Sequence, residues 1–275
     1  MAEFTPIIFD NTRRLAIRAR AASHGFEKAF LVQTMANELA ERLSYVSRKF
    51  ENILVTGPIA QFADSILGTQ TYSLTKNLML EEDILPFAPE SFDLILSAGT
   101  LDSVYDLPGT LVQIRRTLKP DGLFLGTLFG AGSLRTLKAA MLRAEGEQVR
   151  PHIHPQIDLR AASDLMTRTG FALPVADIDT LEVRYSDWRR LVRDLRESGA
   201  SNALSGPRSF NRSMPNALDI SWQAMADPDG RVTENFNFLQ LSGWGPSASQ
   251  PKPAARGSAT VSLADALKKR SKPVF

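Results

Sequence analysis

The sequence predicts an α/β protein whose mainly parallel sheet carries helices on both faces. The first observation is that three apolar runs, each ending at a glycine, alternate with amphipathic segments through the middle of the chain. Alternating elements of this size build a parallel sheet, because right-handed crossovers return the chain to the same edge. The second observation is a pair of longer, half-polar strands late in the chain, which suit an antiparallel edge on that sheet.

Each element is predicted from its own pattern. The apolar runs at 52–57, 92–99 and 122–130 are typical of buried strands, and residues 69–75 are rich in β-forming side chains. Amphipathic segments predict helices at 61–68, 107–118, 158–170 and 187–199. Polar and apolar side chains alternate at 174–185 and 230–244, which are the two late strands.

Composition divides the chain into three parts. Residues 1–47 carry a helical apolar period, broken near Gly25, and predict an N-terminal helical extension. Residues 48–244 hold the alternating elements of the main domain. Residues 245–275 begin as a linker rich in Pro, Ser, Gly and Ala, and end in a short basic helix with a capping pattern at Ser262 and Asp265.

Arginine is concentrated in two of the predicted helical regions. The first group comprises Arg13, Arg14, Arg18 and Arg20. We expect a solvated helix face there, and a basic patch for an acidic partner is the alternative. The second group is interleaved with acidic residues and comprises Arg184, Arg189, Arg190, Arg193 and Arg196. Interleaved signs predict a salt-bridged surface helix, with a docking face for a protein substrate as the alternative.

Composition also excludes several classes of protein and site. The chain has no cysteine, and so neither disulfides nor thiolate metal sites. A formal net charge of +2 over 275 residues does not indicate nucleic-acid binding. No apolar run reaches the roughly 18 residues of a membrane span. The N-terminus is acidic, is broken by Pro6 and is unlike a secretory signal. We therefore expect a cytoplasmic protein without a nucleic-acid partner.

The stretch EEDILPFAPESFDLILSAGTLDSVYDLPGTLVQIRRTLKPDGLFLGTLFG, residues 81–130, resembles the second half of a class I S-adenosylmethionine (SAM) methyltransferase. The segments IFDNTRRLAIRARAA, GFALPVADIDTLEVRY and LSGWGPSASQPKPAARGSA are similar to one subgroup of that superfamily. It contains the mitochondrial complex I assembly factor 5 and its α-proteobacterial relatives, which are similar to the malonyl-carrier-protein methyltransferase of biotin synthesis. The resemblance implies a Rossmann-like, doubly wound sheet of seven strands in a methyltransferase-like domain at 48–244.

The resemblance also implies where SAM would bind. The candidate cofactor residues are Thr56, Gly57, Asp83, Ile84, Ser97, Ala98 and Gly99. In the family, the loop after the first strand is rich in glycine, so that backbone N–H groups can approach the cofactor. Here only Gly57 remains, because Pro58 removes a donor and Ile59 adds a β-branched side chain. The carboxylate that binds the ribose is also absent from residues 71–75.

Two further groups are candidates for chemistry. Asp102 and Tyr105 follow the strand at 92–99, at the mouth of the predicted cleft. Asp102 could act as a general base or orient a cationic substrate, although a loop-capping role is favoured. His152 and His154, with Asp158, could bind iron or zinc. We favour a pair of solvent-facing histidines in a loop instead, and predict no metal.

These features leave three functions open. The first is a SAM-dependent methyltransferase-like protein that acts on a protein substrate or in the assembly of a respiratory complex. The second is a non-catalytic assembly factor on a methyltransferase fold that has lost SAM binding. The third is another activity, such as hydroxylation, because the complex I assembly factor of this subgroup is associated with arginine hydroxylation. All three are compatible with a protein partner.

Overall fold

The computed structural model describes residues 8–68, 72–77, 84–146, 150–206, 212–251 and 262. Its centre is a six-stranded sheet in the order β2-β1-β3-β4-β6-β5. Strands β1 to β4 are parallel, and β6 runs antiparallel to its neighbours β4 and β5. The strands are β1 (Asn52–Thr56), β2 (Ser73–Asn77), β3 (Phe92–Ala98), β4 (Leu118–Phe129), β5 (Ala172–Tyr185) and β6 (Val232–Trp244).

The predicted fold class is confirmed: a mainly parallel, doubly wound sheet carries an antiparallel edge. The chain enters the sheet at β1, the second strand from one edge, and then adds β2 on one side of it and β3 on the other. The described residues form six strands where the resemblance implies seven. Residues 78–83, between β2 and β3, lie outside the described part of the chain.

Helices cover both faces because side chains along each strand alternate between them. In β1, Ile53 and Val55 belong to the core of one face and Leu54 to that of the other. The core of the first face contains α2 (Phe30–Ser44) and α3 (Ala63–Leu67), and it continues into α5 (Arg135–Glu145), α7 (Trp188–Glu197) and α8 (Met214–Gln223). The second face carries α4 (Leu107–Thr117) and α6 (Leu159–Arg168).

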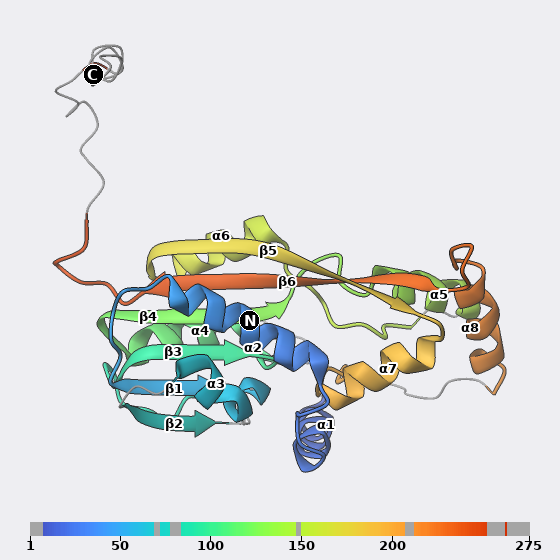
Figure 1. Ribbon diagram of the computed structural model, residues 1–275, viewed down its shortest axis with the longest axis horizontal. Helices are drawn as coiled ribbons and strands as arrows, with labels where there is room; N and C mark the ends of the chain where they lie inside the picture. The colour runs from blue at the N-terminus through green and yellow to red at the C-terminus, as the bar shows by residue number, and fades with distance from the viewer. Residues whose placement is uncertain are drawn as a thin grey trace, which may run out of the picture.

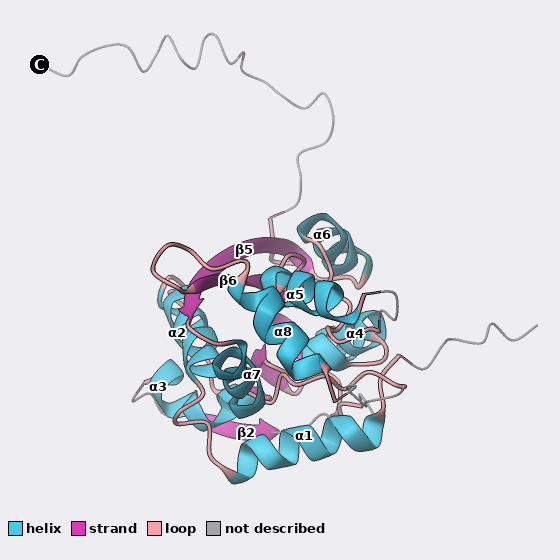
Figure 2. Ribbon diagram, turned by 90° about the vertical axis from the view of Figure 1, so that its right-hand side faces the viewer, coloured by secondary structure: helices cyan, strands magenta, loops and turns pink. Residues whose placement is uncertain are grey.

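Strands β5 and β6 form a ribbon that runs past the end of the central strands. The pairing of β6 with β4 ends at Phe129 and Phe238, whereas its pairing with β5 continues to Val232 and Tyr185. Figure 1 shows this ribbon reaching from the sheet to α5, α7 and α8. Figure 2 looks onto the carboxyl edge of the parallel strands, where these helices and α1 (Asn11–Ser23) lie in front of the sheet. The ribbon therefore places helices over the carboxyl edge.

A buried carboxylate holds the start of α5 against the ribbon. Glu234 of β6 is fully buried, and it accepts hydrogen bonds from the backbone N–H groups of Thr136 (3.0 Å) and Leu137 (2.6 Å). N–H groups in a first helical turn have no partner within the helix, and the helix dipole favours a negative charge there. Burial raises the pKa of Glu234, and the hydrogen bonds from the backbone oppose that shift.

The predicted elements are largely confirmed, with ends shifted by a few residues. Helices α5 and α8 are additional to the predicted elements, although Leu137, Ala140, Met141 and Ala144 of α5 have helical spacing. The predicted C-terminal basic helix lies outside the described residues, except for Ser262. No helix in the described part of the chain is long and apolar enough to cross a membrane.

We expect Glu234→Ala to lower the free energy of unfolding by about 3 kcal/mol, because it leaves the buried N–H of Leu137 and the part-buried N–H of Thr136 without an acceptor. Urea denaturation measures this change. Glu182→Ala is the matched control, since Glu182 is exposed on the neighbouring strand β5, and we expect it to change stability by under about 0.5 kcal/mol. Equal effects of the two substitutions would contradict the anchoring role of Glu234.

Candidate functional site

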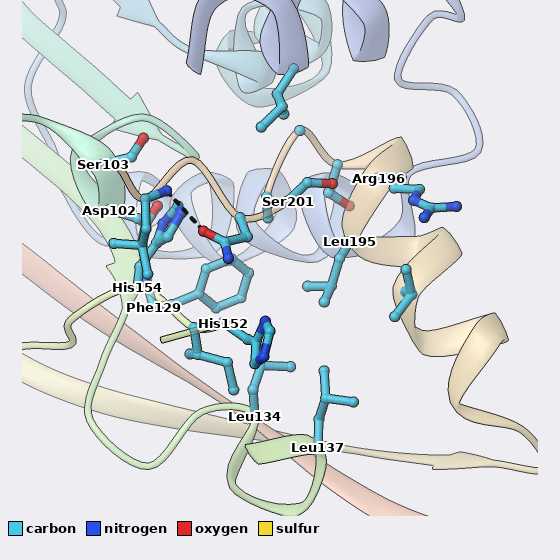
Figure 3. Close-up of a pocket in the computed structure, with 18 of the residues that line it drawn as sticks. Asp102, Ser103, Phe129, Leu134, Leu137, His152, His154, Leu195, Arg196 and Ser201 are labelled. Atoms are coloured by element: carbon cyan, nitrogen blue, oxygen red, sulfur yellow. Dashed lines mark hydrogen bonds between the residues drawn. The ribbon is translucent and has the colours of Figure 1, made fainter. Parts of the chain in front are cut away.

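A cavity of about 570 Å³ opens at the carboxyl edge of the sheet. Its walls come from α1, α2, α5 and α7, from the turns after β3 and β4, and from the loops at 150–156 and 198–205. Much of the wall is apolar and includes Val32, Met35, Phe129, Leu134, Leu137 and Leu195. Figure 3 shows Asp102 and Phe129 on one side of the cavity and Arg196 on the other. Ligands of open α/β sheets bind at this edge, so the cavity is the candidate active site.

Two buried arginines attach α1 to the turn after β3. Arg14 donates to the carbonyl oxygen of Ser103 (2.8 Å), and Arg18 donates to the carbonyl of Thr100 (2.9 Å) and to the Ser103 hydroxyl (3.0 Å). Arg14 is 1% exposed and Arg18 is 4% exposed. The prediction of a solvated helix face is therefore wrong for these two residues. Helix α1 covers the turn after β3 and excludes water from it. The carbonyl groups of that turn therefore need hydrogen-bond donors from the protein, and a guanidinium group supplies several N–H donors.

Asp102 faces the cavity from the 3₁₀-helix η3 (Leu101–Ser103), directly after β3. Its carboxylate accepts a hydrogen bond from the backbone N–H of Phe129, the last residue of β4. Burial raises the pKa of Asp102 to about 6, and this hydrogen bond and the charge of Arg18 oppose the rise. At pH 7 such a group is roughly nine-tenths ionised. Asp102 therefore links two strand ends and presents a negative charge to the cavity.

Tyr105, the other catalytic candidate, is not among the residues that line the cavity. Its hydroxyl donates to the carbonyl oxygen of Phe9, and the Arg14 guanidinium lies 5.1 Å from the centre of its ring. The structure thus places Tyr105 at the attachment of α1, while Asp102 alone of the predicted pair faces the cavity.

The two histidines of the 150–156 loop help to form the cavity wall. His152 bonds to the carboxylate of Glu145 at 2.6 Å, at the end of α5. The Nε2 atom of His154 accepts a hydrogen bond from Ala203 N–H (2.9 Å), and burial lowers the pKa of His154 to about 4. The prediction of two solvent-facing histidines is therefore wrong, because both rings tie the loop to neighbouring elements. Asp158 caps the start of α6.

Five of the seven predicted cofactor residues lie at the ends of β1 and β3, and of the described ones only Gly99 lines the cavity. Gly99 lines it, while Thr56, Ser97 and Ala98 are buried and Ile84 is 54% exposed. Asp83 lies outside the described residues. The predicted cofactor residues after β1 and β3 therefore lie in two closely packed turns beside the cavity.

Gly57 is the single residue between β1 and the 3₁₀-helix η1 (Pro58–Phe62). It has a φ of +85°, and a Cβ there would clash with the carbonyl oxygen of Ala98 and lie 2.9 Å from a methyl carbon of Thr100. A Cβ on Gly99 would lie 3.1 Å from the ring of Pro58. The two glycines therefore let the turns after β1 and β3 pack directly against each other.

This packing does not fit the methionine end of SAM. After Pro58, which has no N–H, Ile59 and Ala60 are completely buried. The described turn thus provides neither the open space nor the row of N–H donors that a glycine-rich loop gives to a bound nucleoside cofactor.

Arginines occupy the rim of the same cavity. The four that line it are Arg13, Arg20, Arg150 and Arg196. Of the late arginine group, Arg189 of α7 pairs with Asp187 and Asp219, which confirms the predicted salt-bridged surface helix for this residue, whereas Arg184 lies on β5 and pairs with Asp227. Arg196 differs from them, because the structure places it at the cavity.

Comparison with known proteins finds relatives over most of the chain. A family model described as "Methyltransferase domain" matches residues 68–126. "Arginine-hydroxylase NDUFAF5, mitochondrial" of Danio rerio is 34% identical over 262 residues, which cover 93% of this chain and 80% of that protein. The human protein of the same name is 31% identical over 261 residues, covering 86% of this chain and 76% of that protein.

Further similarity extends to methyltransferases. The malonyl-[acyl-carrier protein] O-methyltransferase of Xylella fastidiosa is 31% identical over 166 residues, covering 60% of this chain and 55% of that enzyme. Among solved structures, YcgJ of Bacillus subtilis aligns with a TM-score of 0.47 at 12% identity, covering 78% of this chain and 99% of that one. SAM-bound phosphoethanolamine N-methyltransferase 2 of Haemonchus contortus aligns with a TM-score of 0.41 at 18% identity, covering 77% and 53%.

We expect Gly57→Ala to lower the free energy of unfolding by about 3 kcal/mol or more, because a clash with backbone adds to the strain of a positive φ. Gly68→Ala is the matched control. Gly68 has a φ of +69° and a ψ of −158°, close to the φ of +85° and ψ of −172° of Gly57, and a Cβ added to it would meet no atom within 4 Å, so only the backbone strain of about 2 kcal/mol applies. Chemical denaturation measures the free energy of unfolding of both variants, and equal losses of this free energy would show that the turn is not closely packed.

Proposed function

The chain belongs to the family of the mitochondrial arginine-hydroxylase NDUFAF5, and from that membership we propose that it modifies an arginine side chain of a protein substrate. The proposed site is the cavity at the carboxyl edge. The observation that carries the proposal is an ionisable carboxylate, Asp102, facing a largely apolar cavity at the edge where such sheets bind ligands.

The cavity suits a side chain with a long apolar stem and a cationic end. Asp102 is the one carboxylate among the described residues that line it, and a carboxylate forms two parallel hydrogen bonds with a guanidinium. The stem of the substrate arginine would pack against apolar wall residues such as Met35 and Phe129. The hydrogen bond from Phe129 N–H holds the Asp102 carboxylate in place for this contact.

We also propose that the modification serves the assembly of a respiratory complex. The resemblance to a complex I assembly factor supports this role, and a protein substrate is the partner that it requires. The relatives are named mitochondrial, whereas the sequence predicts a cytoplasmic protein. The compartment of this chain stays a prediction.

SAM is the cofactor that the methyltransferase domain suggests, but the closed turn at Gly57 and Pro58 argues against its usual mode of binding. We expect isothermal titration calorimetry to show no SAM binding with a Kd below about 1 mM. A methyltransferase with a complete glycine-rich loop, titrated in the same buffer, is the positive control. Binding in the micromolar range would overturn our account of the turn.

In a host strain that lacks the gene, we expect the wild-type chain to restore hydroxylation of an arginine in a respiratory-complex protein, with dioxygen as the oxidant and a cellular two-electron reductant that converts its second oxygen atom to water. Asp102→Asn should reduce that hydroxylation about tenfold or more, because a neutral amide loses the charge-assisted pair with the guanidinium. Mass spectrometry detects the product as a peptide that has gained one oxygen atom on arginine.

Asp106→Asn is the matched control for that experiment. Asp106 lies outside the cavity and caps α4 through Gly109 N–H (2.8 Å), and asparagine caps a helix as well as aspartate does. We therefore expect it to retain wild-type hydroxylation. If Asp102→Asn restored assembly and the wild type produced no hydroxylated peptide, a non-catalytic assembly factor would be the better description.

A further inference from the structure

The cavity that we assign to the substrate is surrounded by positive charge. Arginines line it from α1, from the 150–156 loop and from α7, and Asp102 is the only carboxylate among the described lining residues. Arg14 and Arg18 lie buried behind the α1 wall. A cationic side chain is repelled by these arginines, so the rest of the substrate has to offset this repulsion.

The rim arginines differ in how they are held. Arg13 donates to the carbonyl oxygens of Leu204 and Gly206 and lies 3.6 Å from the carboxylate of Asp10, so its position is fixed and its charge is paired. Arg20 and Arg196 instead are exposed, in the last turns of α1 and α7. These two guanidinium groups therefore lie at the cavity mouth, on two different helices, in contact with solvent.

The positive charge also reaches the inner part of the cavity. Burial raises the pKa of Asp102 and lowers the pKa of His154, two residues of the wall, and the charge of Arg18 opposes the first shift and adds to the second. A lone guanidinium that enters the cavity is therefore repelled by the arginines around it, and apolar walls strengthen that repulsion. Carboxylates carried by the substrate itself, on either side of its arginine, would offset it.

We propose that the substrate is an acidic protein segment, in which carboxylates that flank the target arginine bind Arg20 and Arg196 at the cavity mouth. This inference rests on the proposed function and deepens it. A guanidinium pairs with a carboxylate in a planar, two-bond geometry, which gives direction as well as attraction. Helices α1 and α7 each supply one guanidinium group. One of these groups binds an acidic residue before the target arginine, and the other binds an acidic residue after it.

A protein segment fits these features better than a nucleic acid does. Nucleic-acid binding requires a continuous basic track along the surface. On the strand and helix next to the cavity, however, Arg184 pairs with Asp227 and Arg189 with Asp219. The charge of these two arginines is neutralised locally, whereas Arg20 and Arg196 border a largely apolar cavity.

The test measures peptide binding to the full chain by fluorescence anisotropy. The probes are an arginine-centred peptide flanked by glutamates, the same peptide flanked by glutamines, and a glutamate-flanked peptide with glutamine in place of arginine. We expect the first peptide to bind about tenfold or more tightly than the second. The double variant Arg20→Glu/Arg196→Glu should remove this preference. Arg168→Glu, which changes an exposed arginine in α6 away from the cavity, should keep it.

Each outcome decides the inference. Equal affinity for the glutamate- and glutamine-flanked peptides, or no binding of either at millimolar concentration, would overturn it. Binding of a single-stranded oligonucleotide that the double variant abolishes would also overturn it, in favour of a nucleic-acid site. If the glutamate preference depends on Arg20 and Arg196 but no arginine is hydroxylated in the host strain, the acidic-segment site stands and the proposed function fails. Thermal unfolding of each variant confirms that it is folded.

Discussion

A buried guanidinium group has to find hydrogen-bond acceptors, and in this protein Arg14 and Arg18 find them in the turn after β3. The carbonyl groups of Thr100 and Ser103 have equally lost their contact with water, so each side satisfies the other. This exchange fixes α1 across the carboxyl edge of the central strands (Figure 2). One wall of the cavity, with Arg13 and Arg20 on it, therefore depends on two arginines that do not themselves face the cavity.

The opposite wall depends on the long ribbon of β5 and β6. Because β6 continues past the end of β4, it carries Glu234 to a place where α5 can begin on a buried carboxylate. Helix α5 then supplies Leu137 to the cavity, and α7, which follows β5, supplies Leu195 and Arg196. The antiparallel edge of the sheet therefore has two roles. It completes the core, and it positions the helices that form this wall of the cavity.

Local patterns were sufficient to predict most of the fold and part of the site. Apolar runs define β1, β3 and β4 because parallel strands are buried on both faces. The start of α5 could not be predicted in this way, because its capping group, Glu234, lies 98 residues away from Thr136. The burial of Arg18 and the role of His154 likewise depend on long-range partners, Thr100 and Ala203. Asp102 could be predicted, because its position after a buried strand places it at the carboxyl edge.

Gly57 and Gly99 show why a family motif and a packing requirement have to be separated. In class I SAM methyltransferases, which the sequence resembles, glycine after the first strand gives a cofactor access to the backbone. Here the same residue type lets two turns of the protein approach each other, so the ring of Pro58 packs beside Gly99. Gly99 also lines the cavity, so the closely packed turns and the cavity are adjacent at this residue. In our proposal, recognition at this edge therefore falls to the carboxylate of Asp102, in the turn after β3, and to Arg20 of α1 and Arg196 of α7.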